Sequence, residues 1–143
     1  MQHKITPKEY NRILEGLQPI IVSLESLSAW VDRENAFEMD TTLSAECKDA
    51  TFVQGGENVV VIASYRCRVR KGRKVILKID ATYRVEFSSE EPFSDEFFDT
   101  YKESSLQLLL WPFFRELVYD ITSKMYIPPL VLPFQIVYQP PKE

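Results

Sequence analysis

The strongest constraint on the fold is a regular alternation of apolar and polar residues in two adjoining segments, 59–69 and 75–87. Successive side chains of a β-strand point to opposite faces, so this period of two predicts two strands that each have one apolar face. The apolar positions are Val59, Val61, Ala63, Tyr65, Cys67, Val69, Val75, Leu77, Ile79, Ala81, Tyr83, Val85 and Phe87. The turn signal between the two segments predicts an antiparallel hairpin in which Val69 lies across from Val75.

Two further strands are predicted before this hairpin. Between 37 and 47 the same alternation recurs, and its apolar face holds Phe37, Met39, Leu43, Ala45 and Cys47. Between 20 and 31 the apolar parity changes near Glu25, which predicts a β-bulge or a bend inside that strand. The polar segment 32–36 and the glycines at 55–56 predict connecting turns.

Helices are predicted on both sides of the strand region. The segment 6–16 predicts a short helix that begins at a threonine cap and ends at a glycine. Ser94 can cap a second helical stretch that carries an aromatic stripe. Ser104 and Gln107 fit the capping box of a long apolar helix. That helix includes Pro112, which either kinks it or marks its first turn.

A sheet with one apolar face needs a cover, and the long helix that follows the strands can provide it. We therefore predict an α+β fold of the order β-β-β-β-α. It has a four-stranded antiparallel sheet, a long C-terminal helix over one face and a short N-terminal helix. The length fits one domain, 1–143. Its expected parts are an N-terminal helical segment 1–17, the sheet 18–88, the helices 93–126 and a Pro-rich tail 127–143.

The composition is that of a folded protein without membrane spans. Apolar residues make up 45% of the chain and charged residues 27%, which excludes a wholly disordered chain. No stretch approaches the roughly 20 apolar residues that span a bilayer. The start of the chain is polar and charged, so we expect no signal peptide and a cytoplasmic location. The net charge of −4 argues against a dedicated nucleic-acid binder.

The residue types that carry most enzyme and metal chemistry are scarce. Two cysteines, Cys47 and Cys67, and one histidine, His3, make neither a disulfide framework nor a zinc site. We therefore expect reduced, inert thiols and no metal. No phosphate-binding glycine loop is present, and no internal histidine can activate a nucleophile. The sequence predicts no enzyme activity and no cofactor.

Charge is distributed unevenly along the chain. The segment 66–78 holds seven basic residues and no acidic one, whereas 86–103 holds seven acidic residues and one basic residue. Three carboxylates near the second strand could act as acid and base, yet they fall opposite three arginines, which favours cross-strand ion pairs. These residues are Glu38, Asp40, Glu46, Arg66, Arg68 and Arg70. The basic hairpin lacks exposed aromatic residues that stack on bases, so a solvated surface or a docking surface for an acidic protein is favoured over nucleic-acid binding.

The chain has more aromatic residues than one helix over a four-stranded sheet is expected to bury, since they make up 13% of it. Core packing accounts for more than half of them. The remainder suggest an oligomer interface or an apolar groove that holds extended polypeptide.

The C-terminal third carries a distinctive set of short motifs. In SSLQLLLWPFFRELVYDITSKMYIPPLVLPF, the apolar run 108–111 is followed by Pro112-Phe113, by Arg115-Glu116 and by the Pro-rich turn 128–133. This set, after four predicted strands, resembles the SecB family of export chaperones and its atypical members associated with toxin–antitoxin systems.

The resemblance implies an ATP-independent holdase that binds unfolded polypeptide in an apolar groove, uses no cofactor and assembles as a dimer of dimers. It also implies that the groove is lined near the sheet edge and the Pro-rich turn. The matching positions are Trp30, Phe37, Phe52, Tyr126, Leu130, Leu132 and Phe134, with Phe93 and Phe97 as outer candidates. Each of them is equally explained as a core residue.

Two departures from the family concern its partner. Export members dock on the translocase motor SecA through acidic residues on the solvent face of the sheet, but Lys78 stands at the corresponding position here. The family's second C-terminal helix and acidic tail also have no counterpart before Glu143. Both departures favour protection of one client, such as an antitoxin, over docking on SecA. The candidate docking residues are Glu25, Arg66, Arg68, Arg70 and Lys78. The alternatives are an adaptor or structural oligomer that binds a folded partner, and a nucleic-acid binder that uses the basic hairpin 66–78.

Overall fold

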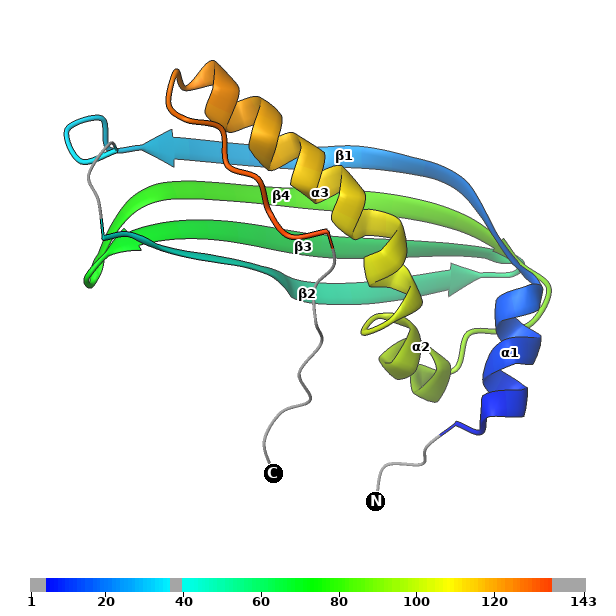
Figure 1. Cartoon of the computed structure of the whole chain (residues 1–143). Helices are drawn as coiled ribbons and strands as arrows, with labels where there is room; N and C mark the ends of the chain where they lie inside the picture. Colours follow the sequence, from blue (N-terminus) through cyan, green and yellow to red (C-terminus); the bar gives the residue numbers. More distant parts are fainter. Residues whose placement is uncertain (1–4, 37–39, 135–143) are drawn as a thin grey trace.

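The structure is a computed structural model that describes residues 5–36 and 40–134. Its elements are α1 (Pro7–Glu15), β1 (Leu17–Val31), β2 (Thr42–Gly55), β3 (Asn58–Lys71), β4 (Lys74–Ser89), α2 (Asp95–Tyr101) and α3 (Ser105–Lys124). The strands form one antiparallel sheet of order β1-β4-β3-β2, so β1 and β2 are its edges. Figure 1 shows α3 crossing one face of this sheet, with α1 and α2 near one end. The predicted α+β fold is confirmed.

The central hairpin β3–β4 has the predicted faces but a different register near its turn. The apolar positions of β3 are all buried, as the alternation predicts. The predicted pairing of Val69 with Val75 is wrong, because Val69 pairs with Leu77 and Arg70 pairs with Val75. Ile76 is the extra residue of this irregularity, and both it and Leu77 are buried. A β-bulge places two consecutive residues opposite one partner, which the alternation alone does not reveal.

The edge strands depart from the predicted boundaries. The predicted bulge near Glu25 is confirmed by a register shift between Leu24 and Ser26, and β1 has a second, unpredicted shift near Pro19. The predicted strand 37–47 is wrong in its limits, since β2 spans Thr42–Gly55. Asp40 has a φ of 66°, a left-handed conformation that a strand residue does not adopt. Part of the predicted segment, including Phe37 and Glu38, lies outside the described residues.

The helix starts follow local hydrogen bonding. The hydroxyl groups of Thr6 and Ser94 accept backbone N–H bonds of 3.2 Å and 3.0 Å and cap α1 and α2, as predicted. The predicted capping box at Ser104 is wrong, because its hydroxyl donates 2.7 Å back to a carbonyl of α2. The Gln107 side chain instead faces the sheet and accepts a 2.6 Å hydrogen bond from the Tyr65 hydroxyl.

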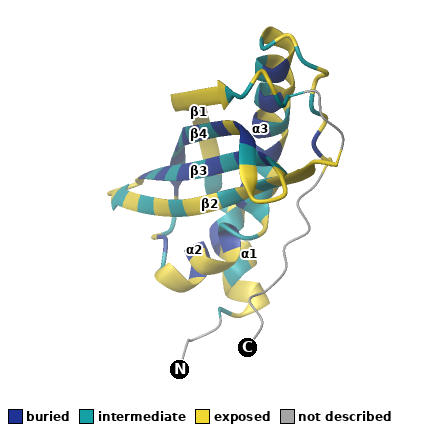
Figure 2. Cartoon of the chain, turned by 90° about the vertical axis from the view of Figure 1, so that its left-hand side faces the viewer, coloured by how far each residue is buried: buried dark blue, intermediate teal, exposed yellow. Residues whose placement is uncertain are grey.

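The core lies between β3, β4 and the helices. Figure 2 shows buried positions along β3, β4 and the inner side of α3, whereas the edge strands are mostly exposed or intermediate. Aromatic rings fill much of this layer, and the Tyr65 ring lies 5.2 Å from that of Phe114. The Phe97 ring of α2 stacks between Tyr10 and Tyr101, with centroids at 5.0 Å and 5.4 Å. The aromatic stripe before and within α2 therefore packs the core.

Candidate functional site

A C-terminal strap, residues 127–134, follows α3 and returns alongside it (Figure 1). Three side chains of α3 hold the strap by hydrogen bonds to its backbone. Thr122 Oγ1 accepts a 2.9 Å hydrogen bond from the Leu130 N–H. Arg115 Nε donates to the Leu132 carbonyl at 2.8 Å, and Trp111 Nε1 donates to the Pro133 carbonyl at 2.7 Å. The backbone of the strap, which is neither helix nor strand, thus obtains hydrogen-bond partners from side chains of α3.

The strap alternates between inward and outward side chains. Leu132 is only 1% exposed and belongs to the core, whereas Val131 and Phe134 face solvent. The guanidinium of Arg115 lies 4.1 Å from the centroid of the Phe134 ring. This cation–π contact holds an exposed aromatic ring beside the outer face of α3.

The outer face of α3 carries apolar side chains that nothing in the described chain covers. Leu108, Pro112 and Tyr119 are exposed and lie on one stripe, because residues four and about seven apart fall on the same side of a helix. Leu108, in the first turn of α3, is 66% exposed and so presents most of its apolar surface to solvent. Pro112 lies inside α3 rather than in its first turn.

Two hollows lie along this stripe. One, of about 380 Å³, is lined by Glu103, Ser104, Gln107, Leu108, Trp111, Pro112 and Phe134. The other, of about 320 Å³, is lined by Pro112, Arg115, Glu116, Tyr119 and Val131. Pro112 lines both hollows, so they adjoin at this residue, and together we call them the α3 groove. It begins at Glu103, just before α3, and its helical lining from Gln107 to Tyr119 is about 18 Å long at 1.5 Å per residue.

The structure gathers only part of the predicted groove set. Phe134 lines the α3 groove, Leu130 and Leu132 belong to the strap beside it, and Tyr126 is exposed at the end of α3. The remaining described candidates lie elsewhere: Phe93 and Phe97 are buried in the core, Phe52 packs against Phe98 at 4.7 Å, and Trp30 lies on the opposite face of the sheet. Phe37 lies outside the described residues.

Of the residues that line the α3 groove, only Phe134 was among the predicted site residues. The exposed apolar residues that the prediction missed are Leu108, Pro112, Tyr119 and Val131. The available signal was the presence of apolar residues on more than one side of the predicted helix. Periodicity could not show which side the sheet covers, because most positions from 106 to 114 are apolar.

The edge strand β1 is exposed along most of its length. Its large apolar residues with substantial exposure are Ile20, Ile21, Leu24, Leu27 and Trp30. The Asp32 N–H donates 2.8 Å to the Ile76 carbonyl of β4, and alternate residues of an antiparallel pair turn their backbone groups the same way. Ser28 therefore directs its N–H toward β4, whereas Ala29 directs its N–H outward from the sheet.

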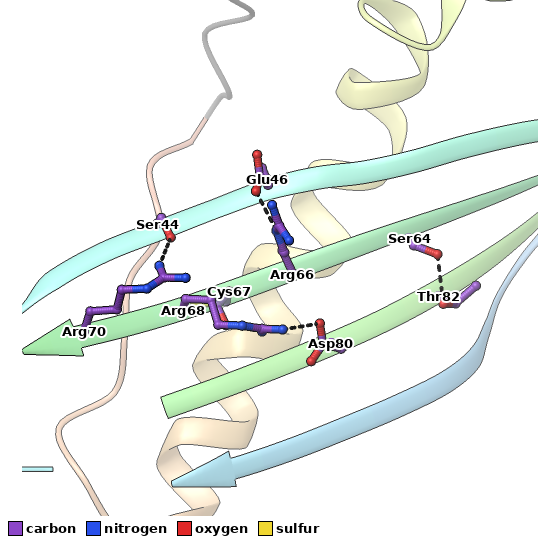
Figure 3. A network of polar contacts seen from close by, with 9 residues as sticks. All are labelled: Ser44, Glu46, Ser64, Arg66, Cys67, Arg68, Arg70, Asp80 and Thr82. Carbon is purple, nitrogen blue, oxygen red and sulfur yellow. Dashed lines mark hydrogen bonds and ion pairs between the residues drawn. The ribbon is translucent and has the colours of Figure 1, made fainter. Parts of the chain in front are cut away.

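The solvent face of the sheet carries a polar network (Figure 3). The Arg66–Glu46 ion pair, at 2.6 Å, confirms the predicted cross-strand pairing for these two residues. Arg68 pairs at 2.9 Å with Asp80 of β4 rather than with an acid of β2. Lys78 and Arg70 also lie on this face, and Glu25 is exposed at the bulge of β1.

No protein-family model and no curated protein matches the chain. Among solved structures, it matches a SecB-like chaperone of Mycobacterium tuberculosis in complex with a ChAD peptide from the HigA1 antitoxin. The TM-score is 0.75 with 22% identity, over 88% of this chain and 96% of that chain. The chain has the SecB-like fold. A protein of unknown function from Streptococcus agalactiae matches with a TM-score of 0.45 and 13% identity, over 82% of this chain and 97% of that chain.

The SecB-like fold here keeps its titratable core groups neutral. Burial raises the pKa of the Cys67 thiol to about 11 and that of the Tyr83 hydroxyl to about 12. Burial also raises the pKa of Cys47, so both thiols are protonated at neutral pH and poor nucleophiles. Among residues 5–36 and 40–134, no group of histidine, cysteine or carboxylate side chains is placed to hold a metal, and no helix is long and apolar enough to cross a membrane.

Proposed function

We propose that the chain is an ATP-independent holdase chaperone that binds non-native polypeptide along the α3 groove. The observation that carries this proposal is the exposed apolar lining at Leu108, Pro112 and Phe134, along a stretch of helix whose length matches about five extended residues. Burial of apolar surface stabilises such a complex by about 25 cal/mol per Å², which favours apolar stretches of any sequence.

The form of the groove suits a loosely specific client. It is shallow, and its two hollows offer several weak contacts rather than one deep pocket. Many weak contacts held together give firm overall binding with rapid exchange at each position. The rim carboxylates Glu103 and Glu116 disfavour acidic client segments, and the Arg115 guanidinium beside Phe134 can donate a hydrogen bond to a client carbonyl.

The client class is inferred from the neighbour in fold. That chaperone was solved with a peptide from an antitoxin, which supports protection of an aggregation-prone antitoxin, in the cytoplasm, as the task of this chain. Export through SecA is less well supported, because the solvent face carries arginines and a lysine where an acidic docking surface is needed.

We further propose that the chain assembles as a dimer of dimers. β1 offers a long unpaired edge, which a second copy can extend by strand pairing. The exposed stripe of α3 beyond the groove, including Phe113, offers a second surface for contact between pairs.

The test is suppression of aggregation. Reduced, chemically unfolded lysozyme is diluted into buffer without nucleotide, and light scattering is recorded at increasing chain concentration. Leu108→Ser should require about five- to tenfold more protein for the same protection, because it removes apolar area from the groove. Val53→Ser is the matched control, since Val53 is 73% exposed on β2, away from the groove. Absence of protection by the unaltered chain, or equal loss in both variants, would overturn the proposal.

A further inference from the structure

We infer that the solvent face of the sheet is a docking site for a short acidic segment of a protein partner, at a cationic corner formed by Arg68, Arg70 and Lys78 beside Trp30. This surface lies on the opposite side of the sheet from the α3 groove, so it goes beyond the proposed client binding.

The sheet register places these residues together. Trp30 of β1, Lys78 of β4, Arg68 of β3 and Ser44 of β2 are successive partners across the four strands and form one row. Neighbouring strands lie about 4.8 Å apart, so the row spans about 14 Å. An extended segment of about four residues covers that distance.

The charges of this corner are only partly neutralised. Arg68 has an ion pair with Asp80 at 2.9 Å. By contrast, the Arg70 guanidinium bonds the Ser44 hydroxyl at 3.3 Å, and the Lys78 ammonium lies 5.5 Å from the Trp30 ring centroid. In the described part of the chain neither of these two cations is ion-paired. Two cations held beside neutral groups leave a local positive potential on a chain whose net charge is −4.

Trp30 gives the corner an apolar contact. Its side chain is 47% exposed on the solvent face, where a buried position would be expected for tryptophan. Tryptophan and arginine are the residue types that most often dominate binding energy at protein interfaces. A partner that places one carboxylate on Lys78 or Arg70 and one apolar side chain on Trp30 would use both.

A shallow hollow beside the row supplies hydroxyl groups. It has a volume of about 310 Å³, and its polar lining is Ser26, Ser28, Lys48, Ser64, Asp80 and Thr82. Small hydroxyl side chains leave room for a partner backbone and can donate or accept hydrogen bonds. The Asp80 carboxylate in this hollow would repel a partner segment made entirely of acidic residues. The partner's carboxylates must therefore lie toward Arg70 and Lys78.

The same observations favour a protein segment over nucleic acid. Glu46 and Asp80 are partners of Arg66 across the sheet, and this row lies next to the row of Ser44, Arg68 and Lys78. Their carboxylates would repel a continuous line of phosphates. Trp30 is one aromatic ring, whereas single strands are held on successive stacking platforms. A short protein motif can instead place its carboxylates where the cations are.

The experiment measures binding of a fluorescein-labelled peptide with four glutamates and two leucines by anisotropy at low salt. We expect at least about tenfold weaker binding in the double variant Arg70→Glu, Lys78→Glu. The double variant Lys8→Glu, Lys124→Glu makes the same change in net charge on the helices and should leave binding unchanged. Because Trp111 is buried, quenching by acrylamide reports mainly on Trp30, and the peptide should protect it.

Three outcomes would overturn the inference: no binding of the peptide, equal weakening in both double variants, or tighter binding of a single-stranded oligouridine probe that Arg70→Glu, Lys78→Glu abolishes. A peptide of glutamines and leucines that binds equally well would also count against it. Thermal unfolding checks the variants, and Arg70→Gln, Lys78→Gln replaces the first pair if that pair does not fold. Protection of unfolded lysozyme should persist in these variants, so failure here is distinguishable from failure of the proposed holdase function.

Discussion

Trp111 and Pro133 are joined by a hydrogen bond of 2.7 Å from the indole Nε1 to the carbonyl oxygen. The indole is buried and packs 5.9 Å from the Phe114 ring, so the same side chain fills the core and anchors the strap. The position of the Phe134 wall of the α3 groove therefore depends on the core.

Replacing Trp111 by Phe should lower the free energy of unfolding by about 1–3 kcal/mol, from the lost hydrogen bond and the smaller ring. Urea denaturation followed by circular dichroism measures this loss. Trp30→Phe is the control, because an exposed ring on the solvent face should cost less than about 0.5 kcal/mol. Equal costs for the two changes would mean that the strap is not anchored at Trp111.

Assembly through β1 can be tested with two neighbouring prolines. Ala29→Pro removes an N–H that points outward from the sheet, so it should block addition of a second strand while preserving the fold. Ser28→Pro removes an N–H directed at β4 and should destabilise the chain itself by about 1–3 kcal/mol, because a ladder hydrogen bond is lost. Light scattering coupled to size exclusion should show smaller particles for Ala29→Pro. An unchanged particle size with that variant would exclude the β1 edge as the interface.

The sequence predicted the middle of the sheet better than its margins. The alternation correctly predicted which residues of β3 are buried, because one face of this central strand packs on the core and the other faces solvent. The register at the turn was missed because the bulge at Ile76 changes pairing without changing composition. The groove was only partly predicted, since Phe97 and Leu108 are both apolar helix residues and only packing decides that one is buried and the other exposed.

Alkaline conditions should destabilise the fold through Cys67. Its pKa is raised from 9.0 to about 11 by burial, so between these values the unfolded state loses the thiol proton while the folded state keeps it. The unfolded state then binds fewer protons, and the free energy of unfolding falls as pH rises from about 9 to 11. Urea denaturation over this range should show a shallower fall for Cys67→Ala than for the unaltered chain. Identical slopes would contradict this linkage.

Acid should weaken the turn after β1. A hydrogen bond from Asn35, together with Lys74 at 3.3 Å, holds the pKa of Asp32 below its ordinary value of 3.8. Stability from the ionised carboxylate is therefore present above about pH 4 and is lost as pH falls through the lowered pKa. Asp32→Asn should be less stable at neutral pH and lose less stability on acidification. Glu34→Gln, in the same turn, should follow the unaltered chain in denaturation at pH 7 and pH 3; if it instead follows Asp32→Asn, the effect is not specific to Asp32.

Leu132 gives the strap a further consequence. Its side chain is buried in the hydrophobic core, and withdrawing a fully buried leucine costs about 2 kcal/mol or more. A guest segment that displaced the strap would have to offer an equally large aliphatic group at that point. Leu132 thus competes with any guest for this core position. Guest segments made of polar or small residues can bind only in the α3 groove.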